Sequence, residues 1–257
     1  MRPELFYKPH LLLERLADKA RKRARLAKLR NTCAAGLQMG HIDSLELLEL
    51  VRENGIECIY DIGANVGTWT LLSKALFPHA MVEAFEPYSP HLDKLRKTVQ
   101  NLSDVRVHSV ALGSENNRMT LRVTSFSDAS SMLPAANPGA WGLAESSQVQ
   151  VPGWRLDDYR TKHNLPLPDL VKLDVQGFEL EVLKGATSCL RHTRVVIAEV
   201  SFVQIYVGQC LFHDVVTYLA KQNLFLTAFG VNTPTGRAAE QTDVLFTRQV
   251  NARQVMQ

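Results

Sequence analysis

A short segment with one acidic residue and two glycines has the composition of a ligand-binding loop. An apolar run ends at Asp61, and Gly63 and Gly67 follow it before a predicted helix. Glycines let the backbone turn tightly and approach a ligand, while the open amides at a helix start favour an anionic group or carboxylate. The dinucleotide fingerprint G-x-G-x-x-G is absent, because Asn65 stands at the second glycine position and the last glycine comes one residue early. The loop therefore suits a pyrophosphate poorly.

The carboxylates around this loop indicate which nucleotide it binds. Asp61, just before the loop, would repel phosphate but pair with an amino-acid ammonium group, which favours S-adenosylmethionine. Glu86 ends the next apolar run, where a carboxylate accepts hydrogen bonds from ribose hydroxyls; NAD enzymes use the same contact. Ser109, after the third apolar run, lies where an adenine edge is expected. The predicted cofactor contacts are Asp61, Gly63, Asn65, Gly67, Glu86 and Ser109.

Two further carboxylates, Asp174 and Glu199, end the fourth and fifth apolar runs. Ligands of open α/β sheets bind at the carboxyl ends of the strands, so both side chains should face one crevice. A hydroxyl acceptor needs a base or a metal to lose its proton. We expect Asp174 to be the leading catalytic or acceptor-orienting carboxylate, with Glu199 second. Structural roles stay open, since Asp174 could cap the helix that begins near Glu179 and Glu199 could pair with Lys172.

The elements that would position these residues alternate between short strands and amphipathic helices. This alternation is typical of a parallel sheet built from βαβ units. Residues 113–167 do not follow this order of strands and helices. Apolar and polar residues alternate over 118–124 and 148–151, as in exposed strands that could pair as a hairpin. The Ser-, Ala-, Pro- and Gly-rich segment between them, 125–147, is predicted to be a long loop, which we expect to be functional. The predicted strands are 58–62, 81–86, 105–110, 170–174, 195–200, 224–229 and 244–247, and the predicted helices are 68–76, 90–101, 179–189 and 211–222.

The N-terminal segment has a different character from the rest of the chain. Residues 1–57 are predicted to form a helical, basic extension, with a catalytic domain over 58–257. Lys and Arg crowd residues 19–30, and leucines at helical spacing precede them. A solvated helix face, an anionic membrane surface, nucleic acid and an acidic partner are the alternatives. Because no aromatic residues are interleaved to stack on bases, no nucleic acid is expected, and peripheral membrane contact is the specific prediction.

Composition sets the broad class. A chain of 257 residues with 46% hydrophobic residues and a net charge of +3 suits one large globular domain with an extension. No apolar run reaches the ~20 residues that cross a bilayer, and no signal-peptide pattern is present, so a cytoplasmic protein is expected. The four cysteines show no C-x-x-C or Cys/His spacing, so neither a zinc site nor a disulfide framework is expected. A divalent metal held by the carboxylates is possible, but no metal-ligand motif in the sequence supports it.

With these residues in view, the chain resembles the FkbM family of methyltransferases over residues 59–247. The most specific match is DLVKLDVQGFE at 169–179 followed by LKGA at 183–186, which is similar to the family pattern KIDVEGFE…LKGA. Gln176 departs from that pattern, which usually has an acidic residue there, and this lowers the expectation of a catalytic or metal role for that position. RLDDY at 155–159 and the serine-rich stretch at 130–132 also resemble family elements.

The resemblance implies a class I methyltransferase fold, which is Rossmann-like. Its sheet would have seven strands, mostly parallel with the last antiparallel, and helices on both faces. It also implies O-methylation of a hydroxyl on a sugar, glycan or other small natural product. Two rival functions stay open. Asn65 and the lack of a Tyr-x-x-x-Lys pair argue against a nicotinamide-dependent oxidoreductase, and the joint presence of Asp61, Glu86 and Asp174 argues against a non-catalytic nucleotide-binding protein.

Overall fold

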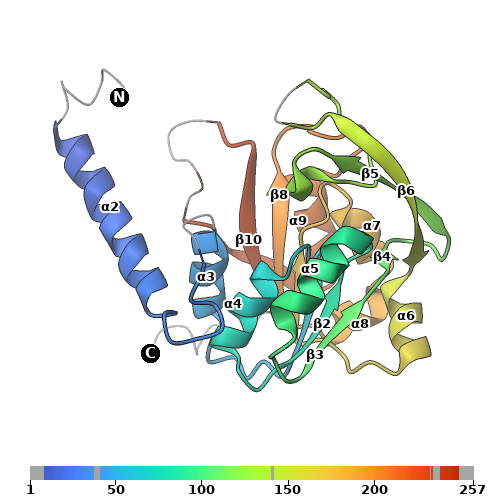
Figure 1. The fold of residues 1–257 in the computed structure, drawn as a ribbon, viewed down its shortest axis with the longest axis horizontal. Helices are drawn as coiled ribbons and strands as arrows, with labels where there is room; N and C mark the ends of the chain where they lie inside the picture. Colours follow the sequence, from blue (N-terminus) through green and yellow to red (C-terminus); the bar gives the residue numbers. More distant parts are fainter. Residues whose placement is uncertain (1–8, 38–40, 140–141, 232, 234–237, 249–257) are drawn as a thin grey trace.

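The computed structural model describes residues 9–37, 41–139, 142–231, 233 and 238–248 (Figure 1). Its centre is a seven-stranded sheet in the order β3-β2-β1-β7-β8-β10-β9. Neighbouring strands are parallel except that β10 runs antiparallel to both β8 and β9. This is the predicted class I arrangement. The strands are β1 (Cys58–Ile62), β2 (Met81–Phe85), β3 (Val105–His108), β7 (Leu170–Leu173), β8 (Val195–Ser201), β9 (Leu224–Phe229) and β10 (Gln241–Arg248).

Side chains alternate across the sheet because successive residues of a strand point to opposite faces. In β1, Cys58, Tyr60 and Ile62 pack into one hydrophobic core and Ile59 packs into another on the opposite face. Both faces are therefore apolar, as expected for a sheet covered on both sides. The first core is closed by α6 (Leu156–His163), α7 (Glu179–Lys184), α8 (Thr187–His192) and α9 (Phe212–Lys221), and the opposite face by α3 (Ile42–Glu49), α4 (Thr68–Leu76) and α5 (Ser89–Val99).

The N-terminal segment has two parts that differ in packing. The helix α2 (Pro9–Ala27) lies to one side of the sheet in Figure 1, beyond α3. The Arg25 guanidinium at its end forms two hydrogen bonds with the Glu46 carboxylate, of 2.8 and 2.6 Å. Leu29 and Ala34 are buried in the same core as α3, against the sheet. The proposed division of the chain at residue 57 stays a prediction, although residues before that point contribute to the core.

The irregular stretch in the middle of the chain forms a small second sheet. The predicted hairpin is confirmed, because β5 (Arg118–Thr124) and β6 (Glu145–Trp154) pair antiparallel, and β4 (Ala111–Leu112) joins them. The loop between β5 and β6 contains the 3₁₀ turn η2 (Ser127–Ala129). An isolated bridge between Ala135 and Tyr206 ties this loop to the segment after β8.

Two local features differ from the sequence prediction. The helix expected over 179–189 is two helices, α7 and α8, separated at Gly185, where an added Cβ would overlap the Gly113 carbonyl oxygen. The helix α6 was not predicted, although Leu156 and Tyr159 share its buried face and Asn164 caps it in a left-handed conformation with a φ of 51°. No helix in the described part of the chain is long and apolar enough to cross a membrane.

Candidate functional site

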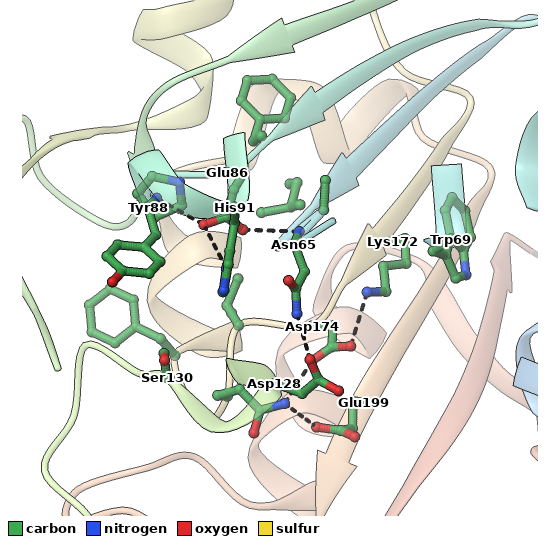
Figure 2. A pocket seen from close by; sticks show the side chains of 18 of the residues that line it. Asn65, Trp69, Glu86, Tyr88, His91, Asp128, Ser130, Lys172, Asp174 and Glu199 are labelled. Atoms are coloured by element: carbon green, nitrogen blue, oxygen red, sulfur yellow. Dashed lines mark hydrogen bonds and ion pairs between the residues drawn. The ribbon is translucent and has the colours of Figure 1, made fainter. Parts of the chain in front are cut away.

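A cavity of about 420 Å³ opens at the carboxyl ends of β1, β2, β7 and β8. Figure 2 shows side chains that line it, arriving from segments far apart in the sequence. The glycine loop and the end of β2 form one side, and the ends of β7 and β8 with the start of β10 form the other. The polar and charged residues on its lining are His41, Ser44, Asn65, Thr68, Glu86, His91, Asp128, Ser130, Ser131, Lys172, Asp174, Gln176, Glu199 and Asp243.

The glycine loop turns from β1 into α4 in left-handed backbone conformations. Gly63 has a φ of 82° and Gly67 a φ of 87°. The amides of Gly63 and Ala64 donate to the carbonyl oxygen of Phe85, at 3.1 and 3.0 Å, and tie the loop to the end of β2. An added Cβ at Gly63 would overlap the carbonyl oxygen of Asp174, so this position requires glycine for close approach as well as for its φ. Gly63 lines the cavity, whereas Gly67 packs against Leu95.

Asp61 lies beneath the loop and is completely buried. The hydroxyl of Thr70 donates to its Oδ2 over 2.6 Å, and its Oδ1 is buried without a hydrogen-bond partner among the described residues. Burial raises the pKa of Asp61, and the positive charge of Lys172 opposes that shift. Its side chain is not part of the cavity lining.

Glu86 holds the loop and lines the cavity. Its Oε2 accepts the amide of Asn65 over 2.9 Å, and its Oε1 accepts the amide of Tyr88 over 2.8 Å (Figure 2). Nδ1 of His91 lies 3.7 Å from the same Oε1. Asn65, with a φ of 49°, donates its side-chain amide to Oδ1 of Asp128 over 2.8 Å, while its own buried Oδ1 has no partner in the described part of the chain.

Ser109 lies outside this arrangement. Its side chain is exposed and does not line the cavity, whereas Val110 and Ala111, directly after it, do. The reason is geometric: β3 ends at His108, and the chain then turns so that the next two residues are buried. The adenine contact of Ser109 stays a prediction.

The two predicted catalytic carboxylates lie close together and share a neighbour. Nζ of Lys172 donates to Oδ2 of Asp174 over 3.0 Å. The side-chain amide of Gln176 donates to both Oδ1 of Asp174, at 2.8 Å, and Oε2 of Glu199, at 3.0 Å. The amide of Gln241 also donates to Glu199, over 3.1 Å. Lys172 therefore pairs with Asp174, and Glu199 is held by two amides.

Strand alternation explains why these charges meet. Asp61 and Lys172 are register partners on adjacent strands, as are Glu199 and Asp243, and all four point to the face that α3 and α4 cover. Burial would lower the pKa of Lys172, but the charges of Asp174 and Asp61 outweigh it and raise the value. Burial, and then the charge of Asp174, raises the pKa of Glu199 well above its usual range and that of Asp243 to about 6.

Glu179 supports the loop that carries Gln176. It begins α7, as predicted, but its side chain is buried. Its Oε1 accepts the amides of Val175, at 3.2 Å, and Gly177, at 3.1 Å. Burial raises the pKa of Glu179 to about 7, although these backbone hydrogen bonds oppose the shift. The carboxylate that caps this turn is thus Glu179 and not Asp174, which leaves Asp174 in the cavity.

Sequence reasoning missed several residues of the site. Lys172 was considered only as a partner for Glu199, yet a lysine inside a buried strand beside an aspartate is a usable signal. Gln176 was discounted because it departs from the family pattern, and its bridging position depends on the distance between two strand ends. Asp128 arrives from the loop before β6, where nothing in the sequence marked it. Among the described residues, no group of three His, Cys, Asp or Glu side chains is arranged to hold a metal ion.

The chain is similar in sequence to a known protein family and to individual known proteins. The family description "Methyltransferase FkbM domain" matches residues 61–226, more than half of the chain. The chain is similar to the hexuronic acid methyltransferase AglP of Haloferax volcanii, at 28% identity over 60% of this chain and 59% of that protein. It is also similar to the 2-O-methyltransferase NoeI of Sinorhizobium fredii, at 29% identity over 59% of this chain and 66% of that protein. The matches thus span less than two thirds of each relative's length.

Among solved structures, the magnesium protoporphyrin IX methyltransferase of Synechocystis PCC 6803 aligns with 82% of this chain and 81% of its own, at 13% identity and a TM-score of 0.46.

Proposed function

Because the chain belongs to the FkbM methyltransferase domain family, we propose that it transfers a methyl group from S-adenosylmethionine to a hydroxyl of a sugar, glycan or other small molecule. One observation carries the proposal: a single cavity joins the glycine loop and Glu86 on one side to Asp174 and Glu199 on the other. The first group is suited to a nucleoside with an amino-acid tail, and the second to a hydroxyl that must lose a proton. The names of AglP and NoeI support a sugar acceptor.

The residues of the cavity fit S-adenosylmethionine. Its volume of about 420 Å³ lies within the ~300–1,000 Å³ typical of small-molecule sites. On the cavity lining, the buried Oδ1 of Asn65 has no hydrogen-bond partner among the described residues, and such groups are rare unless a ligand or water satisfies them. Gly63 lines the cavity with backbone atoms alone. We assign the amino-acid end to the loop above Asp61 and the ribose to Glu86. When bound, the cofactor supplies an electrophilic methyl group.

Asp174 is the residue that we propose accepts the proton of the acceptor hydroxyl. Lys172 and Gln176 fix its carboxylate in one orientation, and a positioned base of this kind is the main requirement for a hydroxyl nucleophile. Glu199 is held to the same amide, and its raised pKa favours the protonated form. The Asp174 carboxylate accepts a hydrogen bond from the acceptor hydroxyl and so aims the hydroxyl oxygen at the methyl group.

The test separates donor binding from turnover. Isothermal titration with S-adenosylmethionine, and with NAD in parallel, should show binding of the former only, reduced by about tenfold or more in Glu86→Ala. Asp174→Asn should keep that affinity and lower kcat by ~10²–10⁴-fold on an accepted hydroxyl. Binding of NAD alone would refute the methyltransferase assignment. Unchanged turnover in Asp174→Asn would refute the role of that carboxylate.

We further infer that the protein is cytoplasmic and contacts anionic membranes through α2. Lys19 and Arg23 are exposed on this helix, as is Leu16 at 55% exposure, and the exposed Lys28 directly follows it. Basic side chains near an anionic surface each contribute about 1 kcal/mol of attraction, and an apolar side chain beside them adds to it.

Vesicle co-sedimentation tests this contact. The protein should bind vesicles that contain phosphatidylserine more tightly than phosphatidylcholine vesicles, and a Lys19→Glu, Arg23→Glu, Lys28→Glu variant should lose that preference. The matched control changes three exposed cations of α5 to Glu and should keep it; these cations are Lys94, Arg96 and Lys97. Equal loss in both variants would mean that net charge, and not α2, decides binding.

A further inference from the structure

Gln176 joins the two carboxyl groups of the candidate site. Its side-chain Nε2 lies 2.8 Å from Oδ1 of Asp174 and 3.0 Å from Oε2 of Glu199. An amide nitrogen of this kind carries two N–H bonds, so the one atom donates to both carboxyl groups at once. The dashed line from Lys172 to Asp174 in Figure 2 marks the ion pair beside this bridge. We call Lys172, Asp174, Gln176 and Glu199 the catalytic wall.

The amide of Gln176 is held in the orientation that the bridge requires. The hydroxyl of Tyr206, which is 2% exposed, lies 3.0 Å from Oε1 of Gln176 and can donate to that atom. Exchanging the amide nitrogen and oxygen would place Oε1 against the ionised Asp174 carboxylate, which has no proton to donate. The backbone is fixed as well, because the hydroxyl of Ser131 donates to the carbonyl oxygen of Gln176 over 2.6 Å.

The turn that carries Gln176 has an unusual backbone. Gln176 has a φ of 53°, in the left-handed region that few residues other than glycine adopt, and Gly177 follows with a φ of 93°. The buried Glu179 accepts the amides of Val175 and Gly177 and so holds this turn. Such conformations persist where surrounding contacts enforce them, and they are concentrated at functional sites. The turn therefore presents Gln176 to the carboxyl groups in a fixed position.

Further donors face the same two carboxyl groups. Oδ2 of Asp174 accepts Nζ of Lys172 over 3.0 Å, and Oε2 of Glu199 accepts the side-chain amide of Gln241 over 3.1 Å. The ammonium balances the charge of Asp174, and the amides fix the spacing of the pair. A divalent cation that bridges carboxylates performs these same two tasks, charge balance and orientation.

A divalent cation at this position would need oxygen ligands in place of these donors. Mg²⁺ and Ca²⁺ are bound by carboxylate, carbonyl and water oxygens. Nε2 of Gln176 directs N–H groups at the two oxygens that would have to face the ion, and the ammonium of Lys172 would repel the ion from Asp174. A carboxylate at position 176 would instead bring a third anionic oxygen ligand to Asp174 and Glu199.

We propose that Gln176 takes the place of a bridging divalent cation, so that the catalytic wall binds none and Asp174 is oriented by Lys172 and Gln176. This inference rests on the proposed methyl transfer. Gln176 is a positioning residue, because it acts on the acceptor hydroxyl through Asp174. Position 176 thereby decides between two modes of holding the carboxyl groups, and a glutamate there creates a cation site.

Manganese titration followed by electron paramagnetic resonance tests the proposal without a known acceptor. Wild-type protein loaded with S-adenosylhomocysteine should bind no Mn²⁺ that Asp174→Asn removes. Gln176→Glu should bind one Mn²⁺ at least about tenfold more tightly than wild type, and adding Asp174→Asn to this variant should abolish that site. Gln100→Glu makes the same chemical change at an exposed position outside the cavity and should create no site.

The outcomes separate this inference from the proposed function. An Mn²⁺ site in the wild type that Asp174→Asn removes would overturn the inference, and this comparison stands even where Gln176→Glu does not fold. A folded Gln176→Glu variant without the site would also overturn it, as would wild-type methyl transfer that EDTA abolishes and Mg²⁺ restores. Failure of the wild type to bind S-adenosylhomocysteine would instead refute the proposed function.

Discussion

Replacing Glu179 by Gln should remove a pH-dependent loss of stability that the wild-type protein carries around neutrality. The Glu179 carboxyl is 4% exposed and caps the turn that presents Gln176. Burial raises its pKa from the ordinary value of 4.5 to about 7. A glutamine keeps an Oε1 that accepts the amides of Val175 and Gly177, and it has no charge to bury.

The magnitude follows from the linkage between proton binding and folding. Between pH 4.5 and about 7 the folded protein holds the Glu179 proton while the unfolded chain releases it, so stability falls as the pH rises through this window. At about 1.4 kcal/mol per pKa unit, the full loss is about 3 kcal/mol, complete above about pH 8. Over the range from about pH 5.5 to 8.5, the expected loss is about 2 kcal/mol.

Urea denaturation at a series of pH values measures this directly. The free energy of unfolding of Glu179→Gln, relative to wild type, should increase by about 2 kcal/mol from about pH 5.5 to 8.5. Glu181→Gln is the matched control on the same helix: hydrogen bonds from Lys184 and Ser114 lower the pKa of Glu181 despite partial burial, so it should add no pH dependence in this range. Parallel stability curves for wild type and Glu179→Gln would refute the reasoning.

Three further changes probe the charged wall and the loop. Lys172→Met leaves the buried carboxylates without their cation and should cost about 3–5 kcal/mol in urea denaturation; a loss below about 1 kcal/mol would mean that the ion pair is not needed. Gln176→Glu places a third carboxylate against Asp174 and Glu199 and should move the acidic limb of the kcat–pH profile to higher pH, whereas an unmoved limb would contradict the bridging role. Gly63→Ala should weaken S-adenosylmethionine binding by more than about tenfold in titration calorimetry or prevent folding, because the added Cβ overlaps the Asp174 carbonyl oxygen. The control is Gly36→Ala, whose added Cβ lies in open space, and equal behaviour of the two variants would refute the close approach.

Much of the fold could be predicted because its signals are local. Most strands of the large sheet are short apolar runs, and most helices between them show periodic apolar faces, so most element types and the parallel arrangement follow from neighbouring residues alone. The same holds for the glycine loop and for Glu86, whose places at the ends of β1 and β2 follow from the order of the chain. The break at Gly185 was not predictable in this way, because it depends on contact with Gly113 from another part of the chain.

The catalytic wall required the tertiary structure. The sequence placed Asp174 and Glu199 at strand ends on its own, since the carboxyl ends of parallel strands meet at one edge. It did not determine that Lys172 pairs with Asp174, that Gln176 bridges both carboxylates, or that Asp128, from the loop before β6, accepts a hydrogen bond from Asn65. Those contacts join residues through the order and spacing of the strands and the path of the loop. They are set by how the whole sheet packs, and no local sequence pattern encodes that packing.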